Sequence, residues 1–193
     1  MRRHTLGILV TLLLLLSSAV YTTVYPHLQN PFDRYEIHSQ PEIVANAREA
    51  GVGVEGVYKV VRVVDGDTVV LNMHGQNVTV RLVGLNTPEV IAPHQSVQCF
   101  GPEASKIAHT LLDDTSVRFE PDPSQGVFDK YYRTLGYIFL QDGTNFNQYM
   151  IERGYGKEYT FKSTYKYQKD YKAAQAQAQS QKRGLWSVCT VSA

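Results

Sequence analysis

Five β-rich segments, with a helical segment after the third and further helices after the fifth, predict an α+β fold that is mainly β. Strands in this number and order are typical of a small five-stranded Greek-key barrel of the OB-fold kind, with about three helices. A hydrophobic segment precedes this region at the N-terminus. The sequence therefore predicts one barrel domain behind an N-terminal extension.

The composition is that of a globular protein. The chain has 193 residues, of which 43% are hydrophobic and 19% are charged, and its net charge is +1. This balance excludes a disordered chain and a polybasic coat for nucleic acid. If the substrate is nucleic acid, a metal ion and local arginine and lysine side chains must neutralise its phosphates.

The N-terminus has the sequence pattern of an export signal. Arg2 and Arg3 precede the apolar run Leu6–Ala19, which ends in small residues as a signal peptide does. Apolar character continues to Tyr25, so a retained membrane anchor is the alternative for residues 1–25. Either way we expect the rest of the chain to be secreted or to face outward from the plasma membrane. Residues 26–55, with several prolines and glycines, are expected to be a linker.

Three strands are expected first. Val57–Val64, Thr68–Met73 and Asn77–Leu85 are rich in β-branched residues and form a predicted meander. The last two strands make a hairpin, because the turn-forming run His74–Asn77 lies between them.

Helices and two more strands follow. Gly101-Pro102-Glu103 opens a helix with proline in its first turn and an acid beside it, and an apolar face extends to Leu112. The remaining elements are two strands, Val117–Glu120 and Leu135–Leu140, and two helices, Phe146–Arg153 after the capping Asn145 and Lys166–Arg183 before Gly184.

Polar residues occupy both ends of the hairpin. Asp65 and Asp67 enter it, and Asn86-Thr87-Pro88-Glu89 leaves it, so pairing brings these oxygens close to Arg81. Clustered oxygens suit a hard cation such as calcium, and a guanidinium suits a phosphate. Taken alone, Asp65-Gly66-Asp67 fits an ordinary turn better, and the second polar segment is what favours a site.

The chain has two cysteines, Cys99 and Cys189. In an oxidising compartment we expect them to form one disulfide, and the alternative is two free thiols. The bond would close a loop of about 90 residues and stabilise the fold by roughly 4 kcal/mol.

The ordered set of motifs resembles the staphylococcal nuclease (thermonuclease) family over residues 56–187, which leaves 188–193 as a C-terminal tail. The motifs are Val64–Thr68, Arg81-Leu82, Asn86–Glu89, Gly101–Ala104, Asp129–Arg133, Arg153-Gly154 and Gly184–Trp186. Any one of these motifs is weak, but their order is specific.

This resemblance implies a calcium-dependent phosphodiesterase of DNA and RNA, preferring single-stranded or denatured substrate. It assigns metal binding to Asp67, Asn86 and Thr87, catalysis to Arg81, Glu89 and Arg133, and substrate binding to Lys130, Tyr131 and Tyr159. Two arginines and a cation would stabilise charge on the phosphate oxygens, and Glu89 would orient or deprotonate water. Singly, each of these side chains fits an ordinary surface role, and the nuclease reading depends on the whole set.

The sequence departs from the family pattern at two positions. Asn86 stands where an aspartate is usual, and it removes one ligand charge, so calcium binding should be weaker. Phe161 stands where an aromatic with a hydroxyl is usual, so stacking would survive without the hydrogen bond.

Three function classes are compatible with these features. The first is an exported or membrane-tethered nuclease, expected as a monomer. The second is a binding module for single strands on the same barrel, with catalysis weakened by Asn86. The third is a calcium-binding structural domain, which does not explain the presence of Arg81 and Arg133.

Overall fold

The computed structural model describes residues 45, 47, 49–90 and 97–189. The expected signal peptide or anchor at 1–25, most of the expected linker and the end of the tail lie outside these residues. Among the described helices, none has both the length and the apolar character needed to cross a membrane.

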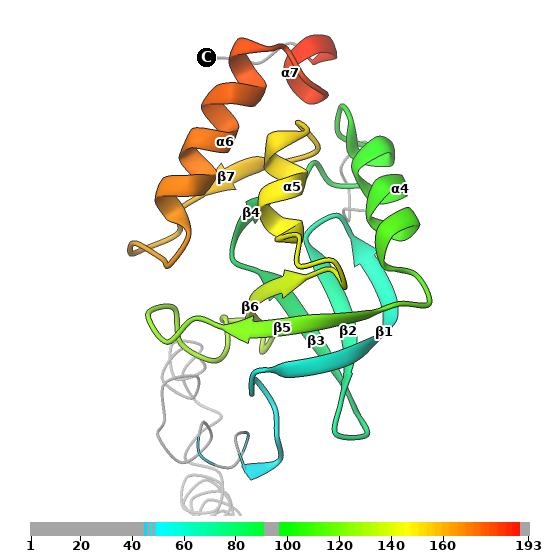
Figure 1. The fold of residues 1–193 in the computed structure, drawn as a ribbon, viewed down its shortest axis with the longest axis vertical. Helices are drawn as coiled ribbons and strands as arrows, with labels where there is room; N and C mark the ends of the chain where they lie inside the picture. Colours follow the sequence, from blue (N-terminus) through cyan, green and yellow to red (C-terminus); the bar gives the residue numbers. More distant parts are fainter. Residues whose placement is uncertain (1–44, 46, 48, 91–96, 190–193) are drawn as a thin grey trace, which may run out of the picture. The chain divides into compact units, whose positions relative to one another are not determined.

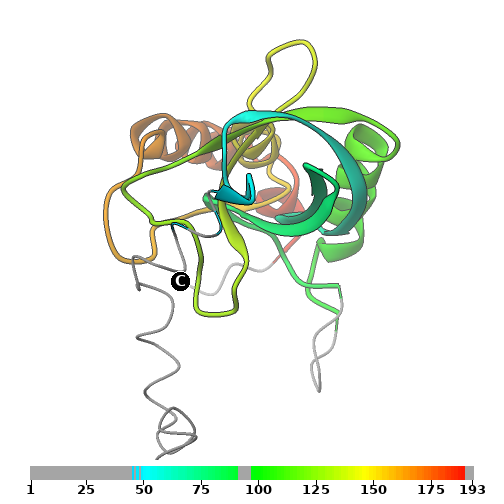
Figure 2. The same ribbon diagram turned by 90° about the horizontal axis from the view of Figure 1, so that it is seen from below.

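Five strands form a closed barrel, as the sequence predicts (Figure 1). Their order around the barrel is β1 (Gly56–Asp65), β2 (Thr68–Met73), β3 (Gln76–Leu82), β6 (Thr134–Phe139) and β5 (Ser116–Pro121). The pairing of β3 with β6 is parallel, and the other pairings are antiparallel. In Figure 2 these strands curve around a common interior.

The hairpin of β2 and β3 has the predicted position. Its turn consists of His74 and Gly75, whose φ angles of 51° and 86° fit the left-handed geometry that a two-residue hairpin turn needs. Thr68 pairs with Arg81 in the ladder, and the Leu82 N–H donates to the Asp67 carbonyl at 2.9 Å. The hairpin therefore places Asp67 beside the end of β3.

The single strand predicted over Asn77–Leu85 is wrong, because the structure divides it at Val83. Gly84 has a φ of 75°, and β4 (Gly84–Asn86) leaves the barrel and pairs with β7 (Lys157–Tyr159) in a separate two-stranded sheet. A Cβ on Gly84 would lie 2.6 Å from the Tyr165 ring, so only glycine allows the strand to turn there. This bend carries Asn86 away from the barrel wall.

Four helices accompany the barrel in the described part of the chain: α4 (Gly101–Leu112), α5 (Phe146–Glu152), α6 (Gln168–Ser180) and the short α7 (Leu185–Val188). Figure 1 shows α4, α5 and α6 gathered at one side of the barrel. The Asn145 side chain caps α5 by accepting from the Gln148 N–H, as expected. Cys99, just before α4, forms a disulfide with Cys189, just after α7.

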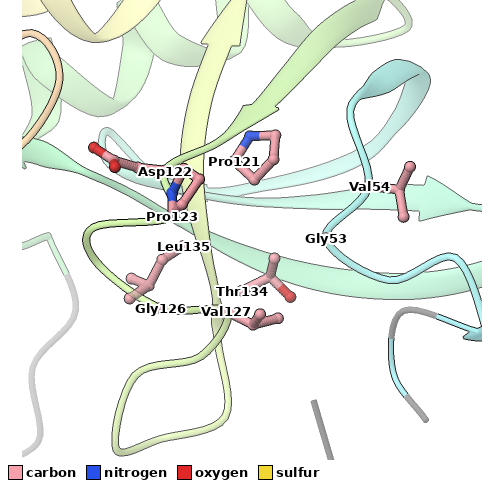
Figure 3. Close-up of a pocket in the computed structure, with 9 residues that line it drawn as sticks. All are labelled: Gly53, Val54, Pro121, Asp122, Pro123, Gly126, Val127, Thr134 and Leu135. Carbon is pink, nitrogen blue, oxygen red and sulfur yellow. The ribbon is translucent and has the colours of Figure 1, made fainter. Parts of the chain in front are cut away.

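The core fills the barrel and the layer between the barrel and the helices. The largest fully buried side chains are Tyr137, Tyr171, Phe119, Phe146, Leu71, Met73, Leu82, Leu85, Leu112, Ile138, Met150 and Ile151. A cavity of about 230 Å³ lies outside this core, between the segment Gly53-Val54 and the loop that joins β5 to β6 (Figure 3). None of the residues that line this cavity belongs to the predicted site.

Candidate active site

Asp67 is the most buried carboxylate of the predicted site, with 3% of its surface exposed. One of its oxygens accepts from the Thr68 hydroxyl at 3.0 Å, and the other accepts from the Thr87 N–H at 3.0 Å. Burial raises the pKa of Asp67 to about 6, the nearby Asp65 adds to this rise, and the charge of Arg81 opposes it. Burial therefore has a larger effect on the pKa of Asp67 than its ion pair with Arg81.

Arg81 links the two ends of the hairpin. Its Nη2 atom lies 3.0 Å from Asp67 Oδ2 and 3.3 Å from Asn86 Oδ1. Its Nη1 atom donates to the carbonyl oxygens of Leu82 and Leu85, at 2.8 and 2.7 Å. Four oxygens thus hold one guanidinium, so its position is fixed before any substrate arrives.

The three residues predicted to bind metal lie around this guanidinium. Asp67 and Thr87 are buried and hydrogen-bonded to each other, while Asn86 is exposed and shares Arg81 with Asp67. In the described ranges, no three acidic, histidine or cysteine side chains form a group that could hold a metal ion. Asp67, Asn86 and Thr87 nevertheless carry only oxygen donors, the ligand type that a hard cation takes, and Asp67 would supply one formal negative charge.

Glu89 and Arg133 belong to the same electrostatic environment. Burial raises the pKa of Glu89, and Asp65 raises it further, while the positive charges of Arg81 and Arg133 act to lower it. All three charged groups are therefore near enough to influence the Glu89 carboxylate. The three residues predicted to be catalytic come from β3, the segment after β4 and the loop before β6, and both arginines act on the charge of Glu89.

Arg133 is held by a carboxylate four residues earlier. Asp129 Oδ2 lies 2.7 Å from both Nε and Nη2 of Arg133, and Asp129 Oδ1 accepts from the N–H groups of Tyr131 and Arg133 at 2.9 Å. Lys130 Nζ and Arg133 Cζ lie 4.9 and 5.4 Å from the centre of the Tyr131 ring. The predicted substrate-binding pair Lys130 and Tyr131 therefore lies beside Arg133, and Tyr131 is 65% exposed.

Tyr159 comes from a different element, the β4–β7 sheet. It pairs with Gly84, and Asn86 at the other end of β4 pairs with Lys157. The Tyr159 ring lies 6.3 Å from the Phe161 ring, and both are exposed. Exposed aromatic rings of this kind offer flat surfaces on which a nucleobase can stack.

Two residues that hold this site were not assigned from the sequence. Asp129 fixes Arg133, and Gln98 contacts both the N–H and the carbonyl of Glu89 at 3.0 Å. For Asp129, the signal was an acid four residues before an arginine in a turn-forming segment. For Gln98 there was none, because its contact with Glu89 spans a loop of unremarkable composition.

Comparison with known proteins agrees with the resemblance found in the sequence motifs. The family model of staphylococcal nuclease homologues matches residues 79–188. A thermonuclease of Staphylococcus hyicus is 38% identical over 133 residues, which cover 69% of this chain and 77% of that protein. A thermonuclease of Staphylococcus intermedius is 36% identical over 129 residues, covering 67% and 75% of the two chains.

A relative outside the staphylococci is also similar. Endonuclease YncB of Bacillus subtilis (strain 168) is 31% identical over 127 residues, covering 65% of this chain and 59% of that protein. Its match has a similar length to the two thermonuclease matches, so the likeness extends beyond a single motif.

Proposed function

Because the chain belongs to the family of staphylococcal nuclease homologues and is a nuclease, we propose that it is a calcium-dependent phosphodiesterase that cleaves DNA and RNA. The observation that carries this proposal is that Asp67 and Asn86 both bind the Arg81 guanidinium. The positive charges of Arg81 and Arg133 also act to lower the pKa of Glu89. A carboxylate can accept a proton from the attacking water, and two guanidinium groups can stabilise the charge that develops on the phosphate.

Each side chain has one task in this mechanism. Arg81 and Arg133 donate to the phosphate oxygens and stabilise the negative charge that grows there as water attacks. Glu89 accepts the proton of that water, and its raised pKa makes it a stronger base at neutral pH. Asp67, Asn86 and the Thr87 carbonyl would hold a calcium ion, which supplies further positive charge beside the scissile phosphate. Lys130, Tyr131 and Tyr159 bind the rest of the nucleotide.

The decisive measurement is hydrolysis of denatured DNA and of RNA by the wild type, with calcium and with a chelator, and by Glu89→Gln with calcium. We expect cleavage only with calcium, and a loss of about 10²- to 10⁴-fold in kcat for Glu89→Gln. Glu103→Gln, an exposed acid in the first turn of α4, is the matched control and should cleave like the wild type. Equal cleavage with the chelator would contradict the calcium requirement, and full activity of Glu89→Gln would contradict the role of Glu89.

A binding module for single strands is the second candidate, and the exposed rings of Tyr131, Tyr159 and Phe161 favour it. The same assay separates the two readings. Binding of denatured DNA that persists in chelator, without hydrolysis at any calcium concentration, would support the binding module and reject the enzyme.

The nuclease domain is proposed to span residues 56–187 and to act outside the cytoplasm, either secreted or tethered at the outer face of the plasma membrane. The disulfide between Cys99 and Cys189 supports this location, because such bonds persist in oxidising compartments. Fractionation of cells expressing the full chain, with the N-terminal residue of the product determined, tests both forms. Recovery of the uncleaved chain in the cytosol would contradict the proposal.

A further inference from the structure

Glu89 is held by its main chain. Its N–H donates to the side-chain oxygen of Gln98 at 3.0 Å, and its carbonyl accepts from the Gln98 N–H at 3.0 Å. For the Glu89 carboxylate itself, the described part of the chain provides no hydrogen bond and no ion pair. The direction of this side chain therefore depends on the peptide groups that Gln98 fixes.

The start of α4 packs directly behind these peptide groups. The Gly101 N–H donates to the Gln98 carbonyl at 3.0 Å. A Cβ on Gly101 would lie 2.8 Å from the Glu89 carbonyl oxygen and 3.2 Å from that of Pro88, so the two segments touch main chain to main chain. A shift of Gly101, which is buried, would therefore press on the Glu89 main chain, because groups this close leave little free space.

Two contacts fix this segment to the C-terminal part of the domain. Cys99, next to Gln98, is bonded to Cys189, and the Phe100 ring stacks on Tyr155 with ring centres 5.8 Å apart. Cys189 follows α7, where Leu185 is 2% exposed and its N–H donates to the Gly154 carbonyl at 2.9 Å. The disulfide thus joins the segment that holds Glu89 to a buried anchor.

We infer that Gln98 is a positioning residue for Glu89, and that the Cys99–Cys189 disulfide keeps Gln98 in register with it. The disulfide thereby contributes to the rate of cleavage as well as to stability. This inference rests on the proposed function of Glu89 as the base. Displacement of a catalytic group by about 1 Å can cost up to about 100-fold in rate, so a hold on its main chain has a direct effect on kcat.

Gln98→Met tests the first half, because methionine keeps the size of the side chain and removes the acceptor oxygen. We expect kcat to fall by between about 10-fold and 100-fold with KM within about twofold of the wild type, since substrate contacts remain. Gln98→Glu keeps an acceptor oxygen and should recover most of the rate. Gln177→Met, on the exposed face of α6, is the matched control and should leave kcat unchanged.

Reduction tests the second half. Dithiothreitol transfers two electrons and two protons to the disulfide, which leaves two cysteine thiols and the cyclic disulfide of the reagent. Reduced protein, and the double variant Cys99→Ser with Cys189→Ser, should lose kcat in the same manner as Gln98→Met. Reoxidation should restore the rate of the wild type only.

Hydrogen exchange at the Glu89 amide gives a readout without substrate. Exchange should speed up by about tenfold or more in Gln98→Met and in the reduced protein, while the amides of β2 and β3 keep their protection. An unchanged Glu89 amide, or an unchanged kcat in folded Gln98→Met, would overturn the inference. Full activity of Glu89→Gln would instead reject the catalytic role of Glu89, and the exchange result would still decide whether Gln98 holds it.

Discussion

Asn86 determines how much negative charge the candidate cation site carries. Replacing it with aspartate adds a carboxylate beside Asp67 without changing the size of the side chain. We expect Asn86→Asp to lower the half-saturating calcium concentration by about tenfold or more, because ligand charge sets affinity in such sites. A calcium titration of DNA cleavage measures this directly.

Asn77→Asp is the matched control for that titration, since Asn77 is exposed on β3 in the same hairpin. It adds the same charge at the far end of the strand and should not alter the calcium requirement. If Asn86→Asp leaves the half-saturating concentration unchanged or raises it, Asn86 is not a ligand.

Arg133 is expected to act on the transition state. Arg133→Ala removes a guanidinium that Asp129 holds in place, and kcat should fall by about 10²- to 10³-fold. Arg62→Ala, an exposed arginine on β1, removes an equal charge elsewhere and should retain the rate. Steady-state cleavage of denatured DNA compares the two variants, and an equal small loss in both would assign Arg133 to general charge attraction only.

The sequence predicted which of these side chains lie together, but it did not predict the residues that hold them. Asp67, Arg81, Asn86 and Thr87 could be expected together because the pairing of one hairpin determines where its ends lie. The hydrogen bonds between Gln98 and Glu89 could not be expected, because they join residues that are nine positions apart and belong to no common strand or helix. The periodicity of the local sequence carries no information about such contacts.

Gly84 separates the barrel strand β3 from β4, and its substitution should be costly. Gly84→Ala places a Cβ against the Tyr165 ring at a φ of 75°, and we expect the free energy of unfolding to fall by about 3 kcal/mol. Gly75→Ala has a similar φ of 86° but no heavy atom within 4 Å of the added Cβ, so it should cost only about 1 kcal/mol.

Urea denaturation of the two variants measures the difference, which isolates the clash with Tyr165 from the strain of the backbone. Equal losses for Gly84→Ala and Gly75→Ala would mean that the ring moves aside without cost.

The strands and helices with strong patterns were predicted, and the short ones were not. The β7 strand has three residues and α7 has four, too few to show a period, and tertiary pairing with β4 is what defines β7. The last helix was expected to run from Lys166 to Arg183. It begins at Gln168, and the Lys166 N–H donates instead to Asp122. It ends at Ser180, and the chain then turns through Lys182, which has a left-handed φ of 49°, so that the Arg183 N–H donates to the Ala178 carbonyl.

Asp122 connects distant parts of the domain. It lies after β5, accepts from the Tyr137 hydroxyl of β6 at 2.6 Å, and accepts from the Lys166 N–H before α6 at 3.0 Å. Burial acts to raise the pKa of Asp122, but the donors Lys166, Tyr137 and Ser124 together lower it below its ordinary value. A carboxyl whose pKa is lower in the folded state stabilises the protein above its unfolded pKa, and this contribution is lost as the pH falls through the folded value.

We therefore expect Asp122→Asn to lower the free energy of unfolding by about 2 kcal/mol at pH 7, because hydrogen bonds to a charged acceptor are lost. The difference from the wild type should shrink as the pH falls below about 4, where the unfolded carboxyl takes up its proton. Urea denaturation at pH 7 and in acid measures it, with Asp114→Asn, an exposed acid after α4, as the control. A difference that is constant with pH would mean that the charge of Asp122 has no part in stability.

The parallel pairing of β3 with β6 affects the order in which the barrel can form. β6 is the last barrel strand in the chain. It pairs with β3, where Val80 lies opposite Thr134, and on its other side with β5. During synthesis β1, β2 and β3 can pair as soon as they emerge, but the ring stays open until residue 139 is available. Contacts so distant along the chain form slowly, so the barrel of a growing chain stays open for most of its synthesis and closes only when its last strand joins β3.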